Sequence, residues 1–109
     1  MELYINILRK LLFGGVVVDT LKVIGSKKRL EILHELSKQD MYVSELMRAV
    51  GLDGKTIKHH LDILENKGIV STREEGLRKY YSLEKEVMVV ISPSPDRRYV
   101  VQVRDVERG

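Results

Sequence analysis

Apolar residues recur at helical spacing in the middle of the chain and predict three consecutive helices. The first helix is expected over Lys27–Lys38. Leu30, Ile32, Leu33 and Leu36 recur along it at helical spacing. Ser26 stands immediately before it, and a serine hydroxyl can accept a hydrogen bond from the unpaired N–H groups of a first helical turn. We therefore expect Ser26 to cap this helix.

A second helix of about two turns is expected after Ser44, which would cap it in the same way. Gly51 supplies the flexible backbone on which such helices end. A third helix is expected over Gly54–Asn66, directly after Asp53. Its inner face would consist of Ile57, Leu61 and Leu64.

The connection between the second and third helices is short enough to permit a sharp angle, with Leu52 buried at the corner. This is the arrangement of a helix-turn-helix unit, in which the later helix contacts base edges in the major groove. The outward residues of that helix are Lys55, Thr56, Lys58, His59 and Asp62. Lysine, threonine and histidine side chains can contact bases or phosphates. The alternative is that these polar residues simply solvate the helix.

Two runs rich in β-branched and aromatic residues predict a β-hairpin after the third helix. The runs cover residues 69–73 and 77–81, and the turn is expected at residues 74–76. Arg73, Arg78 and Lys79 would lie near its tip or flanks, where they could reach phosphates or a minor groove. Glu74 and Glu75 oppose a uniformly cationic tip.

The order and spacing of these pieces resemble the ArsR-type winged-helix regulators. The resemblance covers roughly residues 17–84 and is carried by the segments 21–33, 43–46, 56–70 and 76–83. It implies a dimeric transcription factor that binds double-stranded DNA. The reading helix of that family often has a serine two residues before its histidine, where this chain has Lys58. The base preferences of the family are therefore not carried over.

Many members of that family sense metals through cysteines near the start of the second helix, whereas this chain has no cysteine. A thiolate metal site is therefore impossible. His59 and His60 are adjacent, so on a helix their rings point about 100° apart and do not easily share one metal ion. We expect His60 to pack at the junction of helix and hairpin, His59 to face DNA and His34 to be partly exposed, with no metal and no cofactor bound.

Composition agrees with a single DNA-binding domain. The chain has 109 residues, a net charge of +3 and a hydrophobic content of 43%. No apolar run reaches the roughly 18 residues needed to span a bilayer, so we expect a cytoplasmic protein without a membrane partner. The sequence has no catalytic Ser/His/Asp set and no phosphate-binding glycine loop, so we do not expect an enzyme. No motif identifies a small-molecule effector.

The first residues predict an amphipathic helix over residues 1–16. Its apolar stripe is formed by Leu3, Ile7, Leu8, Leu11 and Leu12. Burying such side chains stabilises by about 25 cal/mol per Å², so a stripe this wide needs a covering surface. We assign it to a dimer interface, with packing on its own domain as the alternative.

The tail, residues 85–109, predicts a second hairpin with strands at 87–91 and 99–103 around a proline-containing turn. The family resemblance implies a helix here that packs in the dimer core, so this hairpin is a candidate to replace it. The unbroken apolar run at 87–91 indicates burial on both faces. The alternative is an exposed edge that another protein covers.

The expected fold is mainly α with a small β-sheet: a winged helix-turn-helix with an extra N-terminal helix and a C-terminal β-hairpin, all in one domain over residues 1–109. The expected function is sequence-specific transcription regulation by a homodimer, with the third helix in the major groove and the hairpin, or wing, on the backbone or minor groove. The alternative is a protein interaction module of a transcription complex. The candidate DNA contacts are Ser44, Lys55, Thr56, Lys58, His59, Arg73, Arg78 and Lys79.

Overall fold

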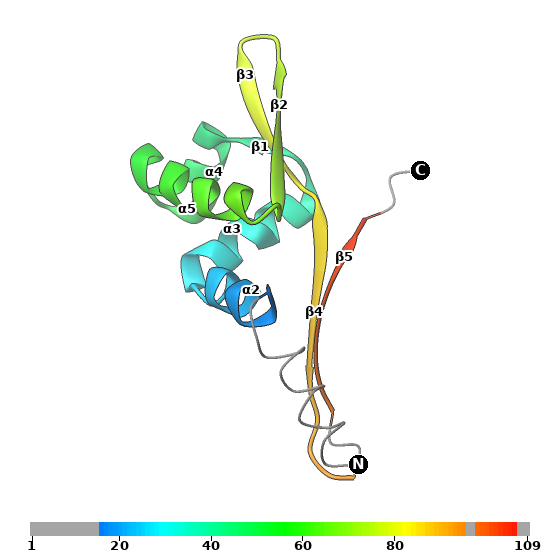
Figure 1. Cartoon of the computed structure of the whole chain (residues 1–109). Coiled ribbons are helices and arrows are strands. Elements are labelled where there is room, and N and C mark those ends of the chain that lie inside the picture. The colour runs from blue at the N-terminus through cyan, green and yellow to red at the C-terminus, as the bar shows by residue number, and fades with distance from the viewer. Residues whose placement is uncertain (1–15, 96–97, 107–109) are drawn as a thin grey trace.

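A computed structural model describes residues 16–95 and 98–106 (Figure 1). The helices are α2 (Val16–Ile24), α3 (Lys27–Lys38), α4 (Val43–Val50) and α5 (Gly54–Asn66). The strands are β1 (Met41–Tyr42), β2 (Val70–Glu75), β3 (Arg78–Leu83), β4 (Lys85–Ile91) and β5 (Tyr99–Asp105). This confirms the expected fold class, with a winged helix-turn-helix followed by a β-hairpin. Within the described ranges no helix has the length and apolarity that crossing a bilayer requires.

The segment assigned to a dimer interface lies outside the described residues. That segment holds Leu3, Ile7, Leu8, Leu11 and Leu12. The first helix among the described residues, α2, begins at Val16 and is joined to α3 through Gly25 and a bend at Ser26.

Local signals place the two long helices as predicted. The Ser26 hydroxyl accepts a hydrogen bond from the Arg29 N–H at 3.3 Å, and α3 covers Lys27–Lys38. Asp53 caps α5 by accepting from the Thr56 N–H at 2.8 Å. Both helices therefore begin where a side-chain oxygen satisfies their first N–H groups.

The predicted cap of α4 at Ser44 is wrong. The helix begins at Val43, its N-cap is Tyr42, and the Glu45 carboxylate accepts from the Tyr42 N–H at 3.2 Å. Tyr42 ends strand β1 with an extended backbone, so the helix starts directly at the end of the strand. Glu45 lies three residues later and reaches back to the cap, which leaves Ser44 exposed in the first turn.

The core lies where α5 packs between α3, α4 and the base of the wing. The inner residues of α5 are fully buried as predicted: Ile57, Leu61 and Leu64. Ile32 and Leu36 of α3 and Leu46 of α4 complete the core from the helical side. Tyr81 is buried from the sheet side, because its strand β3 is central in the order β1-β3-β2. Helix α5 is thus fixed on one face and free on the other.

The wing is the β2–β3 hairpin, which projects from the helices in Figure 1. Its turn is Gly76-Leu77 rather than residues 74–76, and Gly76 takes a positive φ of 66° that favours glycine. Glu74 pairs with Lys79 and Glu75 with Arg78 across the ladder. Residues of opposite charge thus face each other in register, and the ladder runs up to the glycine.

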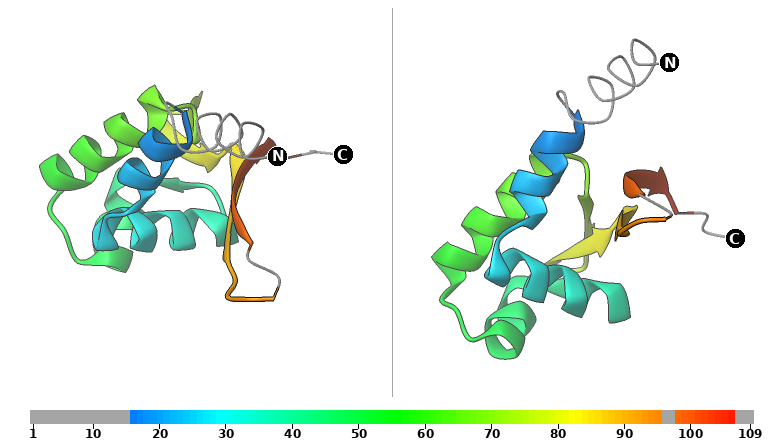
Figure 2. Two further views of the ribbon diagram at one scale, coloured as in Figure 1. Left: turned by 60° about the horizontal axis from the view of Figure 1, so that its bottom comes forward. Right: turned by 90° about the horizontal axis from the view of Figure 1, so that it is seen from below.

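The tail forms the predicted antiparallel hairpin, β4–β5, as a separate two-stranded sheet. Both views of Figure 2 show it to one side of the helices. The expected burial of residues 87–91 on both faces is wrong within the chain, because Met88 and Val89 are exposed and Ile91 is 70% exposed. A two-stranded sheet lacks the layers that cover both faces of a larger parallel sheet. Ion pairs join Lys85 to Asp105 and Glu86 to Arg104 across the base of this hairpin.

Candidate nucleic-acid interface

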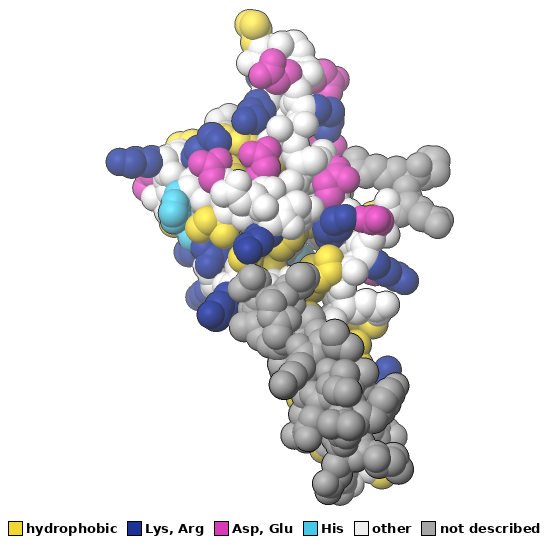
Figure 3. All heavy atoms as spheres, in the orientation of Figure 1, with side chains coloured by type: hydrophobic (Ala, Val, Ile, Leu, Met, Phe, Trp, Pro, Cys, Tyr) yellow, Lys and Arg dark blue, Asp and Glu magenta, His cyan; other side chains and the backbone are white. Residues whose placement is uncertain are grey.

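The outward face of α5 carries exposed cationic and polar side chains. Lys55, Lys58 and His59 are exposed, whereas Ile57, between Lys55 and Lys58, is fully buried. Figure 3 shows Lys and Arg side chains gathered over the helical part of the molecule. A helix with one face anchored in a core and the other free and cationic has the form that major-groove recognition requires.

Lys58 is already paired in the absence of DNA. Its Nζ lies 2.6 Å from Asp62 Oδ1 one turn later on α5, with the two side chains 46% and 51% exposed. The hydrogen bond to Asp62 raises the pKa of Lys58. Lys58 therefore stays charged, and it must exchange a carboxylate for any base or phosphate that it contacts.

Thr56 takes part in the start of α5. Its hydroxyl donates to Asp53 Oδ2 at 2.8 Å, and its N–H donates to Asp53 Oδ1. The bonds from the backbone and side chain of Thr56 lower the pKa of Asp53. The hydroxyl proton is thus engaged, while the oxygen lone pairs and the methyl group of Thr56 stay available for contacts.

Two cations of the wing rest on aromatic rings. The Arg78 guanidinium lies 4.5 Å from the centre of the Tyr42 ring, and Lys79 Nζ lies 5.6 Å from that of Tyr81. A hydrogen bond with the Tyr80 side chain, followed by the charge interaction with Tyr42, raises the pKa of Arg78. Because Tyr42 is the N-cap of α4, Arg78 is held beside the end of α4 that carries Ser44.

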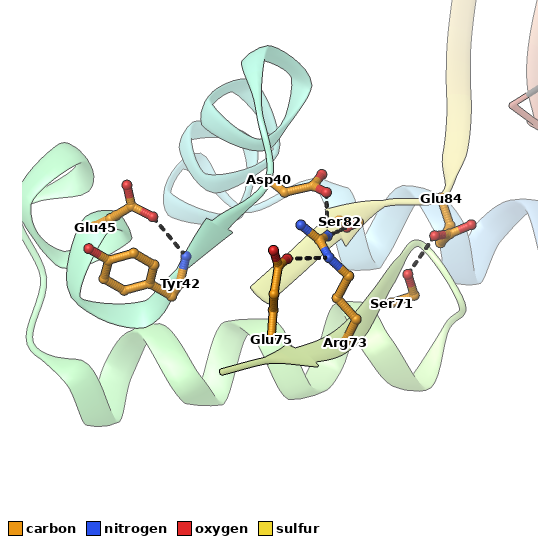
Figure 4. A network of polar contacts seen from close by, with 8 residues as sticks. All are labelled: Asp40, Tyr42, Glu45, Ser71, Arg73, Glu75, Ser82 and Glu84. Atoms are coloured by element: carbon orange, nitrogen blue, oxygen red, sulfur yellow. Dashed lines mark hydrogen bonds and ion pairs between the residues drawn. The ribbon is translucent and has the colours of Figure 1, made fainter. Parts of the chain in front are cut away.

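Arg73 is tied to the body of the protein, as Figure 4 shows. Its Nη1 donates to Asp40 Oδ2 at 2.5 Å and to the Ser82 hydroxyl at 3.0 Å, and its Nε donates to Glu75 at 3.3 Å. The hydrogen bond to Asp40 is the main cause that raises the pKa of Arg73. Figure 4 also shows the neighbouring bond from Ser71 to Glu84, which joins β2 to the end of the wing.

Aromatic contacts across the sheet were missed from the sequence. Tyr42 of β1 and Tyr80 of β3 pair directly, and their rings meet edge to face with centres 5.5 Å apart. Arg73 lies 5.0 Å from the centre of the Tyr80 ring. The only available signal was the short run Met41-Tyr42 before α4, which is too brief to identify as a strand from its pattern.

The histidines do not form a metal site in the described part of the chain, where no three suitable side chains gather. His60 was expected at the junction of helix and wing, but its Nδ1 instead lies 3.3 Å from Arg29 Nη1 on α3. Burial, then the charges of Arg29 and His59, lower the pKa of His60. The rings of His59 and His60 are 5.8 Å apart and tilted by 53°, and His34 is exposed.

Comparison with known sequences identifies one family along the helix-turn-helix. The family model for bacterial regulatory proteins of the arsR family matches residues 26–72. Nodulation protein NolR of Rhizobium meliloti is 35% identical over 71 residues, which cover 65% of this chain and 58% of NolR. The arsenical resistance operon repressor of Staphylococcus xylosus is 32% identical over 76 residues, which cover 70% of this chain and 73% of the repressor.

Solved structures agree with these sequences. The homodimeric winged helix-turn-helix DNA-binding domain Mb0332 of Mycobacterium bovis, a possible ArsR-family regulator, superimposes with a TM-score of 0.61 at 31% identity. The match covers 69% of each chain. NolR of Sinorhizobium fredii superimposes with a TM-score of 0.60 at 35% identity, over 62% of this chain and 68% of NolR. Of these relatives, the Staphylococcus xylosus protein is named as an operon repressor and Mb0332 as a DNA-binding domain.

Proposed function

The chain belongs to the arsR family of bacterial regulatory proteins, and we propose that it regulates transcription as a homodimer that binds specific sites on double-stranded DNA. The observation that carries this proposal is the outward face of α5. Lys55, Lys58 and His59 project from a helix whose other face is buried in the core, and strand β2 of the wing, the hairpin that carries Arg78 and Lys79, packs against this helix. The solved Mb0332 domain supports the proposal, since it is a homodimeric DNA-binding domain.

In the proposed complex, two α5 helices enter successive major grooves of an inverted repeat. The half-sites are then about 10 bp, or roughly 34 Å, apart. Lys58 and His59 contact base edges, Thr56 contacts a phosphate or a thymine methyl, and Lys55 and Ser44 contact phosphates. The wing lies on the backbone or minor groove through Arg78 and Lys79.

The proposed dimer uses the first residues of the chain. Residues 1–16 carry the apolar stripe assigned to the interface, and the exposed apolar residues of β4–β5 are a second surface that a partner chain can cover. We treat residues 1–109 as one domain. Because the proposed partner is DNA, the proposed compartment is the cytoplasm. No cofactor takes part.

Selection from a library of fragmented genomic DNA tests this function. The full chain is incubated with the library, and bound fragments are recovered and sequenced. We expect enrichment of an inverted repeat with half-sites about one helical turn apart. Failure to enrich any sequence, together with binding that ignores salt concentration, would overturn the proposal in favour of a protein interaction module.

A matched pair of variants sharpens the selection. Lys58→Ala removes a lysine from the outward face of α5, and Lys38→Ala removes a similarly exposed, ion-paired lysine from α3. The first variant should lose enrichment of the selected site, and the second should keep it. Equal enrichment by both variants would contradict the role of α5.

A further inference from the structure

We propose that Arg73 is a positioning residue of the wing: it latches β2 to the helical body through Asp40, sets the angle of the wing, and holds Arg78 in place for DNA. This inference rests on the proposed DNA binding. It assigns Arg73 a role other than the direct DNA contact expected from the sequence.

The contacts of Arg73 join two parts of the fold. Asp40 lies between α3 and β1, so its bond with Arg73 Nη1, at 2.5 Å, connects the projecting hairpin to the helices (Figure 4). The same Nη1 donates to the hydroxyl of Ser82, which is buried on β3. A guanidinium is planar and rigid, so the bonds at Nη1 and Nε of Arg73 fix its orientation. Arg73 is therefore held both by Asp40, next to the helices, and by Ser82, on β3 of the wing.

A row of packed aromatic rings and guanidinium groups couples the position of Arg73 to that of Arg78 across the sheet. The Arg73 guanidinium lies over Tyr80, the Tyr80 ring meets Tyr42 edge to face, and the Arg78 guanidinium lies over Tyr42. The row runs from β2 through β3 to β1, the strand that leads into α4. Because each member packs on the next, a shift of Arg73 displaces Tyr80 and then the site where Arg78 rests.

The charges around Arg73 and Arg78 differ. Arg73 contacts two carboxylates, Asp40 and Glu75, so the group as a whole carries more negative than positive charge and does not attract phosphate. Arg78 makes no ion pair with a carboxylate in the described segments, and its guanidinium rests on the Tyr42 ring. Arg78 is the wing arginine that is free to contact DNA.

Two carboxylate variants test the latch. For Asp40→Asn, an effect of charge alone and a loss of positioning predict opposite changes in the affinity for DNA. Asp40→Asn and Glu75→Gln each remove one negative charge from the same cluster. Charge alone predicts that both bind DNA more tightly. The latch predicts that Asp40→Asn binds the selected operator at least about twofold more weakly, which is the lower limit for coupled contacts. Glu75→Gln should bind as tightly as wild type or more tightly.

Arginine variants give a second, independent measurement. The slope of log K against log salt falls by about 0.9 for each phosphate contact removed. Arg73→Ala should weaken operator binding without changing this slope, whereas Arg78→Ala should lower it. Arg73→Lys keeps the charge but loses the planar fork, so it should bind as weakly as Arg73→Ala.

Fluorescence anisotropy with labelled operator and the full chain measures all of these affinities, and thermal unfolding followed by circular dichroism verifies that each variant is folded at the assay temperature. Tighter binding by folded Asp40→Asn, or a lower salt slope for Arg73→Ala, would overturn the latch while wild-type binding keeps the proposed function. Absence of salt-dependent binding by wild type would overturn the proposed function itself.

Discussion

Replacing Lys58 gives the sharpest prediction for sequence reading by α5. Lys58 is exposed, its Nζ lies 2.6 Å from Asp62, and it is one of the outward residues of the proposed reading helix. On its specific site Lys58 contacts a base edge. On random DNA it interacts only with the negative charge of the phosphates, which does not depend on sequence. Lys58→Ala should therefore weaken specific binding more than nonspecific binding.

The ion pair with Asp62 sets the size of the effect. A good base contact contributes about 1–3 kcal/mol of discrimination. Releasing Lys58 from an exposed pair one helical turn apart costs about 0.3–0.5 kcal/mol. The net loss in Lys58→Ala is then about 0.5–2.7 kcal/mol per half-site, or roughly twofold to a hundredfold. Asp62→Asn removes the competing carboxylate and should tighten binding by about twofold.

Competition assays measure these ratios directly. Labelled operator is bound by each variant and displaced with unlabelled operator or with random DNA of equal length. Lys38→Ala is the control, because Lys38 forms a comparable exposed pair with Glu35 on α3. Equal losses on operator and random DNA for Lys58→Ala would refute its contact with bases.

Three further predictions concern capping, pH and the wing. Ser26→Ala should lower the free energy of unfolding by about 1 kcal/mol in chemical denaturation, and Ser44→Ala should change it little, because Ser44 does not cap α4. Burial and the neighbouring Arg29 lower the pKa of His60, so the folded protein favours the neutral ring. Its contribution to stability is present above the ordinary pKa of 6.5 and is lost as the pH falls below it, and His60→Gln should flatten that part of the pH profile measured by thermal unfolding. Arg78→Ala should weaken binding to operator and random DNA alike in anisotropy titrations, since a phosphate contact is present on both.

The sequence was sufficient to predict those features that depend only on neighbouring residues. The cap at Ser26 and the inward spacing of Ile57 and Leu61 depend only on residues within a few turns, and the structure has α3 and α5 at the predicted bounds. The cap of α4 was missed because Glu45 acts only once Tyr42 is recognised as the end of a strand. That strand is defined by its partner β3, far along the chain.

Contacts between residues far apart in the chain could not be predicted from the sequence. Asp40 and Arg73 are separated by 33 positions, and each alone has the pattern of a solvated charge. Glu74 and Glu75 were placed in the turn because they lie between the two β-branched and aromatic runs, yet they belong to β2 and face Lys79 and Arg78 of β3. The pairing that stabilises these residues exists only after the hairpin has formed.

The central claim is that the outward face of α5 enters the major groove. Methylation of guanine N7 by dimethyl sulfate on the selected operator tests it most directly, because N7 lies in that groove. We predict protection of guanines in two half-sites about 10 bp apart by wild type, and loss of that protection in Lys58→Ala. Guanines that stay as reactive as in free DNA, while the protein is bound, would contradict the account.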